Sequence, residues 1–270
     1  MKNFIITSAI VLAGMTQFSM AQDQHDHVHL HVNPRWKECS FQLDPSLTQD
    51  EWHQFTREAG LVAYFRPLTD AKPMGAWHFE ISLLQWATSI DDEDGAWNNT
   101  FVHPDSTHWL TEGSSLAFPG LTARVGLTEK LDVGIYWTKN PNANYGFWGG
   151  QLQYNLTEDA GRKLATATRL SFVSMYGPED LNLTVYGIDL LASKEFRLFS
   201  DRASISPYAG ISTYLSTSHE KTEAVNLDNE QVFGAQAMVG AVAKLWFARL
   251  GVEYNFANVN TLSFKIGLGF

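Results

Sequence analysis

The chain has 270 residues, a length that suits one large domain or two modest ones. Hydrophobic residues make up 44% of it and aromatic residues 13%, a composition that argues against a disordered protein. The formal net charge of -10 argues against binding to nucleic acid, because a surface that binds phosphates needs an excess of Lys and Arg.

Residues 1–21 have the pattern of a secretory signal peptide. Lys2 supplies the positive charge, residues 4–14 form a short apolar core, and small side chains precede the expected cleavage site after Ala21. The apolar core is too short for a stable membrane-spanning helix, and no other segment reaches the roughly 18 apolar residues that such a helix needs. Cys39 is the single cysteine, so an internal disulfide is excluded.

Residues 22–74 form a polar extension with one predicted helix. Thr48 is a good N-cap, and Glu51 three residues later completes a capping box, which predicts a helix near residues 49–59. Gly60 is expected to end this helix as a C-cap. An apolar stripe follows one face of the helix, at Trp52, Phe55 and Ala59. The stripe is expected to pack against the rest of the chain. The alternative is a helix that plugs a larger structure or docks a partner.

From residue 75 to residue 270, apolar and polar side chains alternate along successive segments. Alternation is typical of strands with one apolar face, because neighbouring side chains point to opposite sides. In the last segment the apolar positions are Leu262, Phe264, Ile266, Leu268 and Phe270. Nine earlier segments show the same pattern, which predicts about ten strands. Eight or twelve are the alternatives, because residues 61–68 suit a short strand or a buried linker and the segment near 233–243 is weakly patterned.

The connections between the predicted strands fall into two classes. Short turns are expected at 128–130, 157–163, 196–201 and 245–247. The opposite connections include two long ones, and they are expected at 91–114, 139–144, 177–181, 217–230 and 257–260. Short turns on one side and longer loops on the other are typical of a closed antiparallel barrel with the longer loops outside the cell. An even number of strands then places residues 22–74 in the periplasm, beside or inside the barrel mouth.

The signal segment, the alternating strands of residues 75–270 and the terminal Phe270 together resemble an outer-membrane β-barrel protein of a Gram-negative bacterium. The resemblance implies an all-β fold, a closed antiparallel transmembrane barrel surrounded by outer-membrane lipid. It also implies that the barrel-assembly machinery reads the last strand during biogenesis. The residues that would carry this assembly signal are Phe264, Ile266, Leu268 and Phe270.

One face of the predicted strands carries charges that would point into the barrel. The acidic residues are Glu80, Asp132, Asp189, Glu195 and Glu253, and the basic residues are Arg124, Arg169, Arg249 and Lys265. Side chains fill most of so narrow a barrel, and the near balance of signs favours buried ion pairs in a plugged structural barrel. The other interpretation is a narrow passive channel whose charges select a small solute. An adhesive or partner-binding barrel and a secreted β-sandwich are further alternatives.

Two groups of side chains suggest metal binding. His25, His27, His29 and His31 share one face of an extended segment, which would suit weak binding of Zn, Cu or Ni, although a flexible polar tail has the same composition. The acidic loop 91–114 suits Ca²⁺ and a solvated surface equally well. No resident cofactor is expected.

An enzyme is not expected either. Two sets of Ser and His residues fall in predicted outer loops, and a hydrolase at the outer rim is therefore an alternative function. The first set is His103, Ser106 and His108, and the second is Ser216, Ser218 and His219. Neither set has the spacing of a nucleophile motif.

Overall fold

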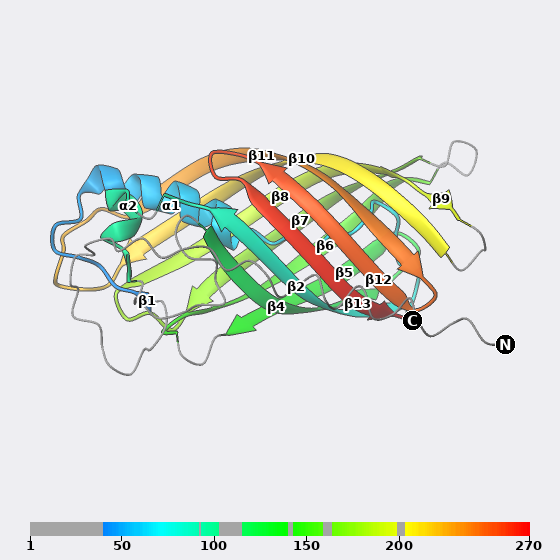
Figure 1. The fold of residues 1–270 in the computed structure, drawn as a ribbon, viewed down its shortest axis with the longest axis horizontal. Coiled ribbons are helices and arrows are strands. Elements are labelled where there is room, and N and C mark those ends of the chain that lie inside the picture. The colour runs from blue at the N-terminus through cyan, green and yellow to red at the C-terminus, as the bar shows by residue number, and fades with distance from the viewer. Residues whose placement is uncertain (1–39, 92, 103–114, 140–142, 159–163, 199–202) are drawn as a thin grey trace, which may run out of the picture.

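The structure is a computed structural model that describes residues 40–91, 93–102, 115–139, 143–158, 164–198 and 203–270. Within these residues ten long strands form one closed antiparallel barrel, which confirms the predicted fold class (Figure 1). Each strand pairs with the next one along the chain, and the last strand pairs with the first to close the ring. The barrel strands are β2 (Phe79–Ser89), β4 (Ser115–Gly126), β5 (Leu131–Lys139), β6 (Gly146–Glu158), β7 (Leu164–Tyr176), β8 (Leu181–Lys194), β10 (Ala203–Glu220), β11 (Glu230–Leu245), β12 (Ala248–Phe256) and β13 (Thr261–Gly269).

The predicted alternation separates the two faces of the barrel. In β13, Ile266 is 60% exposed on the outer face, whereas its neighbour Lys265 is 4% exposed on the inner face. The other strands show the same contrast, with large apolar side chains such as Leu83, Ile135 and Ile188 on the outside. Closure satisfies the backbone hydrogen bonds of every strand edge, as a lipid-exposed sheet requires. An apolar outer face on a closed antiparallel barrel is the architecture of proteins that span outer membranes, so the chain is an outer-membrane β-barrel protein.

The two ends of the barrel differ in their connections. One end, here the short-turn end, carries the two-residue turn between β11 and β12 and the C-terminal Phe270, and a short strand, β9 (Phe196–Arg197), pairs there with β10. The other end, here the long-loop end, carries α2 (Gly95–Asn98) and the loop 221–229. None of the helices in the described part of the chain is long and apolar enough to cross a membrane.

The N-terminal extension begins at the long-loop end. A short strand, β1 (Ser40–Phe41), pairs with β3 (Phe101–Val102) in the first long loop. The helix α1 (Gln49–Ala63) follows, and the predicted capping box is confirmed, since the Thr48 and Glu51 side chains each accept a hydrogen bond from the other's backbone N–H.

The predicted end of this helix at Gly60 is wrong, because α1 continues to Ala63. At Gly60 the helix lies very close to the barrel wall. A Cβ atom on Gly60 would lie 2.6 Å from the Cβ atom of Ser216 in β10. The missing side chain therefore lets the helix lie against the strand, and burial of the next three residues sustains the last turn.

The extension occupies the barrel interior. α1 contacts β8, β10 and β11, while Trp86 on the opposite strand β2 donates a hydrogen bond to the carbonyl of Val62. Residues 64–78 then run through the lumen to the short-turn end, where β2 begins, and residues 64–68 are a buried linker and not a strand. On the predicted orientation the long-loop end is the outer one. Residues 40–63 lie at this end, so they cannot be periplasmic if the predicted orientation holds. One of the two predictions, the orientation or the periplasmic position of residues 40–63, is therefore wrong.

Candidate functional site

The lumen is filled by residues 49–74, here named the lumen plug, and its first half rests on apolar contacts. Trp52 and Phe55 of α1 are fully buried with their rings stacked 5.4 Å apart. Phe55 also meets Trp97 of α2 edge-on, at 5.1 Å between centroids. The inward-facing wall around them is apolar too, and it includes Leu84, Trp86, Phe147, Val173, Leu181, Leu183 and Val185. At about 1.5–3 kcal/mol per buried large apolar side chain, this cluster is the main source of plug stability.

The middle of the plug is held by one tyrosine and one arginine. The Tyr64 hydroxyl donates a hydrogen bond to Asp189 on β8. A Cβ atom at Gly187 would lie 2.4 Å from the Tyr64 hydroxyl oxygen, so this glycine makes room for the ring. Arg66 is 1% exposed and donates to neutral oxygens, namely the carbonyls of its own segment and, across the lumen, Asn255 Oδ1 at 2.9 Å.

Burial lowers the pKa of Arg66 to about 10, so the guanidinium remains charged at neutral pH. The carboxylate of Glu253 on β12 opposes this effect of burial. Glu253 itself is 1% exposed and accepts a hydrogen bond from the Tyr208 hydroxyl at 2.6 Å. One buried cation on the plug thus faces one buried anion on the wall, and their charges compensate each other inside the barrel.

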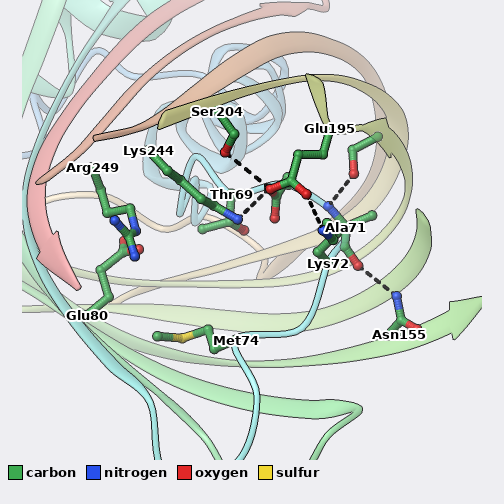
Figure 2. A network of polar contacts seen from close by, with 12 residues as sticks. Thr69, Ala71, Lys72, Met74, Glu80, Asn155, Glu195, Ser204, Lys244 and Arg249 are labelled. Atoms are coloured by element: carbon green, nitrogen blue, oxygen red, sulfur yellow. Dashed lines mark hydrogen bonds and ion pairs between the residues drawn. The ribbon is translucent and has the colours of Figure 1, made fainter. Parts of the chain in front are cut away.

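The last part of the plug, residues 69–74, is held by a network of polar contacts (Figure 2) and by a small apolar cluster of Ala71 with Ala165, Ala167 and Leu191. Lys72 forms an ion pair with Glu195 at 2.5 Å, and Asp70 forms one with Lys244 at 2.9 Å. Backbone groups of the plug are also bound. The N–H of Ala71 donates to Ser193, and the carbonyl of Ala71 accepts from Asn155. The path of the segment is therefore fixed both through its side chains and through its backbone.

Both ion pairs lower the pKa of their carboxyl group. Burial raises the pKa of Asp70, but the charge and hydrogen bond of Lys244, together with further polar neighbours, lower it by more, so the pKa lies below its ordinary value of 3.8. The same opposition holds at Glu195, where burial raises the pKa, but the hydrogen bond and charge of Lys72, together with weaker effects of other neighbours, leave it below 4.5. Both carboxylates are consequently ionised at neutral pH and attract the two lysines.

The structure places the nine charged residues predicted for the lumen on the inner face or at its short-turn rim. Three pairs form among them along the wall: Arg124 with Asp132 at 3.0 Å, Arg169 with Asp189 at 2.8 Å, and Lys265 with Glu80 at 2.8 Å. Glu195 and Glu253 face the plug. Arg249 donates to the backbone carbonyls of Trp246 and Ala248. Six of the nine charges are therefore paired with each other along the wall.

Sequence reasoning missed the charged residues that connect plug and wall. Arg66, Asp70 and Lys72 belong to a segment that has no periodic pattern, so no face could be assigned to them. Lys244 is different. Phe233 and Val239 of β11 point outward, and the alternation from those positions puts residue 244 on the inner face. The pattern of β11 was therefore a sufficient signal for Lys244.

The predicted assembly signal lies on the outer surface of the last strand. Phe264, Ile266, Leu268 and Phe270 are each about half exposed, and all four point toward lipid. Phe270 stacks on Phe79 at 5.2 Å, across the seam where the last and first strands meet. These contacts show where the residues lie, and recognition by the assembly machinery stays a prediction.

The structure does not bring together the predicted catalytic sets. His103, Ser106 and His108 lie outside the described residues. In the second set Ser216 and Ser218 of β10 are buried on the inner face, whereas His219, the next residue in the sequence, is exposed and pairs with Asn229. Alternation along β10 separates these groups, as it does for any neighbours in a strand.

Of the two predicted metal sites, the structure describes only part of the second. The tract His25, His27, His29 and His31 lies outside the described residues. In the acidic loop, Asp94 caps α2 by accepting from the N–H of Ala96, and Asp91 accepts from the N–H of Glu93. No cluster of three or more metal-ligating side chains occurs among the residues that the structure describes.

Comparison with known protein families decides the family. Residues 91–270 match the family described as "Family of unknown function (DUF6588)". The chain belongs to this family. The match includes nine of the ten barrel strands, from β4 to β13, while β2 and the lumen plug precede it. A comparison with curated protein sequences found no match.

Among solved structures the chain is similar to several barrels. An outer membrane channel from Pseudomonas putida F1 is 12% identical, with 77% of this chain and 100% of that chain covered and a TM-score of 0.43. The beta domain of the Bordetella autotransporter BrkA is 10% identical, with 73% and 99% covered and a TM-score of 0.39. The N-terminal β-barrel domain of Pseudomonas aeruginosa OprF is 11% identical, with 73% and 99% covered and a TM-score of 0.29.

Proposed function

We propose that the chain is a plugged outer-membrane barrel that does not conduct ions in its resting state, because residues 49–74 of the same chain close its lumen. The observation that carries this proposal is that the plug reaches opposite walls at successive depths. Val62 is bound by β2, Tyr64 by β8 and Arg66 by β12. With a closed lumen, the role of the protein lies in the membrane and at its surface, in structure or partner binding.

The energetics support closure at the long-loop end in particular. Opening a path there would expose Trp52, Phe55 and Leu61, each at most 1% exposed in the structure. At about 1.5–3 kcal/mol each, exposing these three side chains costs several kcal/mol before any other contact is counted. Spontaneous opening at this end is therefore rare.

Conductance in a planar lipid bilayer tests the proposal. The purified full-length protein is expected to insert without steady ion channels at moderate voltage. A variant that lacks residues 49–74 is expected to conduct, and a heat-modifiability gel shows whether it still folds as a barrel. Steady, uniform channels from the intact protein would contradict the proposal.

A channel that opens when the plug moves is the second candidate. It is favoured by the polar contacts of residues 69–74, since the side chain of Lys72 is 41% exposed and exposed ion pairs exchange readily with water. A cross-link separates the two candidates. Thr56 of α1 and Ser218 of β10 have their hydroxyl oxygens 2.5 Å apart, so cysteines at both positions, with Cys39→Ser, would tie the plug to the wall. Channels that appear in the reduced protein and vanish on oxidation would establish the movable plug.

A further inference from the structure

A cavity of about 90 Å³ opens at the short-turn end, beside the last residues of the plug. One water molecule needs roughly 10–15 Å³ of cavity volume on the same measure, so the cavity has room for several waters or one small solute. Its lining is rich in cations, namely Lys72, Arg124, Lys244, Arg249 and Lys265. The acidic side chains of the lining are Asp70 and Glu80, and the C-terminal Phe270 lines the cavity too. Figure 2 shows Lys244, Arg249 and Lys72 around this part of the lumen.

Four of the five cations are neutralised by a carboxylate. Lys244 pairs with Asp70 and Lys265 pairs with Glu80, so the two lining carboxylates are both engaged. The remaining two pairs, Lys72 with Glu195 and Arg124 with Asp132, use carboxylates that do not line the cavity. Arg249 forms no ion pair with any carboxylate among the described residues.

Both arginines of the lining have free N–H donors. Arg249 uses Nη1 for the carbonyls of Trp246 and Ala248, which leaves Nε and Nη2 without a hydrogen bond to any described residue. Its guanidinium lies against Gly269, where an added Cβ would be 3.1 Å from Nε. Arg124 is 5% exposed, and its Nε is buried without a hydrogen-bond partner in the described part of the chain.

We propose that this cavity binds a small oxyanion, the phosphate or carboxylate group of a solute, with Arg249 as its main ligand. The Nε and Nη2 groups of a guanidinium form a planar fork that matches two oxygens of a phosphate or a carboxylate. The ion pairs around the cavity hold the neighbouring ammonium groups in place. The bound anion supplies the anionic partner that Arg249 lacks among the described residues.

Isothermal titration calorimetry tests this site on the full-length protein in detergent micelles, in chloride buffer at neutral pH. The probes are inorganic phosphate and acetate, and the stronger of the two signals identifies the class of oxyanion. Saturable binding is expected for the wild type. It should weaken about tenfold or more in Arg249→Gln, because a charge-assisted pair of hydrogen bonds is lost. Arg249→Lys should weaken it too, since a lysine keeps the charge without the fork.

Lys130→Gln is the matched control, because Lys130 is an exposed cation in a turn at the same end and does not line the cavity. It is expected to bind like the wild type. A heat-modifiability gel confirms that each variant is a folded barrel. No saturable binding of either anion by the wild type, or equal binding by Arg249→Gln, overturns the proposal. The main ligand, Arg249, belongs to the wall strand β12 and not to the plug, so this experiment and the conductance experiment can fail independently.

Discussion

The two halves of the lumen plug are held by different forces. Residues 49–68 contribute to the large apolar cluster, which extends from the long-loop end as far as Leu68, whereas residues 69–74 are bound mainly by charged and amide side chains toward the short-turn end. The inner wall changes in the same direction. Along β2 it runs from Glu80 and Ser82 to Leu84 and Trp86, as the strand passes from the short-turn end to the long-loop end.

This difference shows how one barrel combines a stable plug with a defined chain path. Apolar burial is strong and non-directional, so it supplies stability but tolerates sliding. Hydrogen bonds and ion pairs contribute less net energy, but each requires a specific geometry. We therefore expect substitutions in the first half to change stability most, and those in the second half to change the position of the segment.

The largest expected effect comes from Trp52→Ala. Removing a fully buried indole leaves a cavity in the apolar half, and the free energy of unfolding should fall by about 3–5 kcal/mol. Urea titration of the barrel folded into lipid vesicles measures this value. His53→Ala, an exposed position on the same helix, is the control and should cost far less. A loss below about 1 kcal/mol for Trp52→Ala would remove the distinction between the two halves.

An intermediate effect is expected for Gly60→Ala. Its effect on the free energy of unfolding should be opposite in sign to that of the same substitution in an ordinary helix. Alanine normally stabilises a helix interior by about 1 kcal/mol relative to glycine. Here the new Cβ would lie 2.6 Å from the Ser216 Cβ and 2.9 Å from the Tyr214 ring, so a destabilisation of about 1–3 kcal/mol is expected. The same urea titration measures it.

A second substitution sharpens the Gly60 result. Ser216→Gly removes the nearer of the two clashing side chains, so the double variant should recover part of the loss. Stabilisation by Gly60→Ala alone would show that α1 lies farther from β10 than the structure has it.

The smallest effect is expected for Glu195→Gln in the second half. The ion pair with Lys72 is partly exposed, so at neutral pH its loss should cost at most about 1 kcal/mol. Because the pKa of Glu195 is lowered in the folded protein, its contribution is present above the ordinary pKa of 4.5 and is lost as the pH falls through the lower folded pKa. The difference in unfolding free energy between wild type and variant should therefore shrink from pH 7 toward pH 3. An unchanged difference at low pH would mean that charge is not its cause.

The strands show how far sequence reasoning reached. Alternation assigned the inner and outer faces of β2, β5 and β13 correctly, because a period of two follows directly from strand geometry and needs no partner. The same pattern placed Glu80, Arg124 and Lys265 in the lumen. It could not say which acid meets which base, since pairing depends on how the strands are staggered around the ring.

The plug shows where sequence reasoning stopped. The helix was predicted from Thr48 and Glu51, which lie three residues apart. Its end was missed because Gly60 packs closely against Ser216, which lies more than 150 residues away along the chain. The partners of Tyr64 and Lys72 lie 125 and 123 residues away along the chain. No local pattern records contacts of this kind.

By itself the sequence determined the strands, their two faces and the presence of a capped helix before them, because these follow from side-chain periodicity and hydrogen bonding over a few residues. Only the tertiary structure decided that this helix and the segment after it enter the barrel, close the lumen and leave Arg249 without a carboxylate partner among the described residues. The reason is that these features depend on distances between segments far apart in the chain, which are set when the ring of strands closes around the plug.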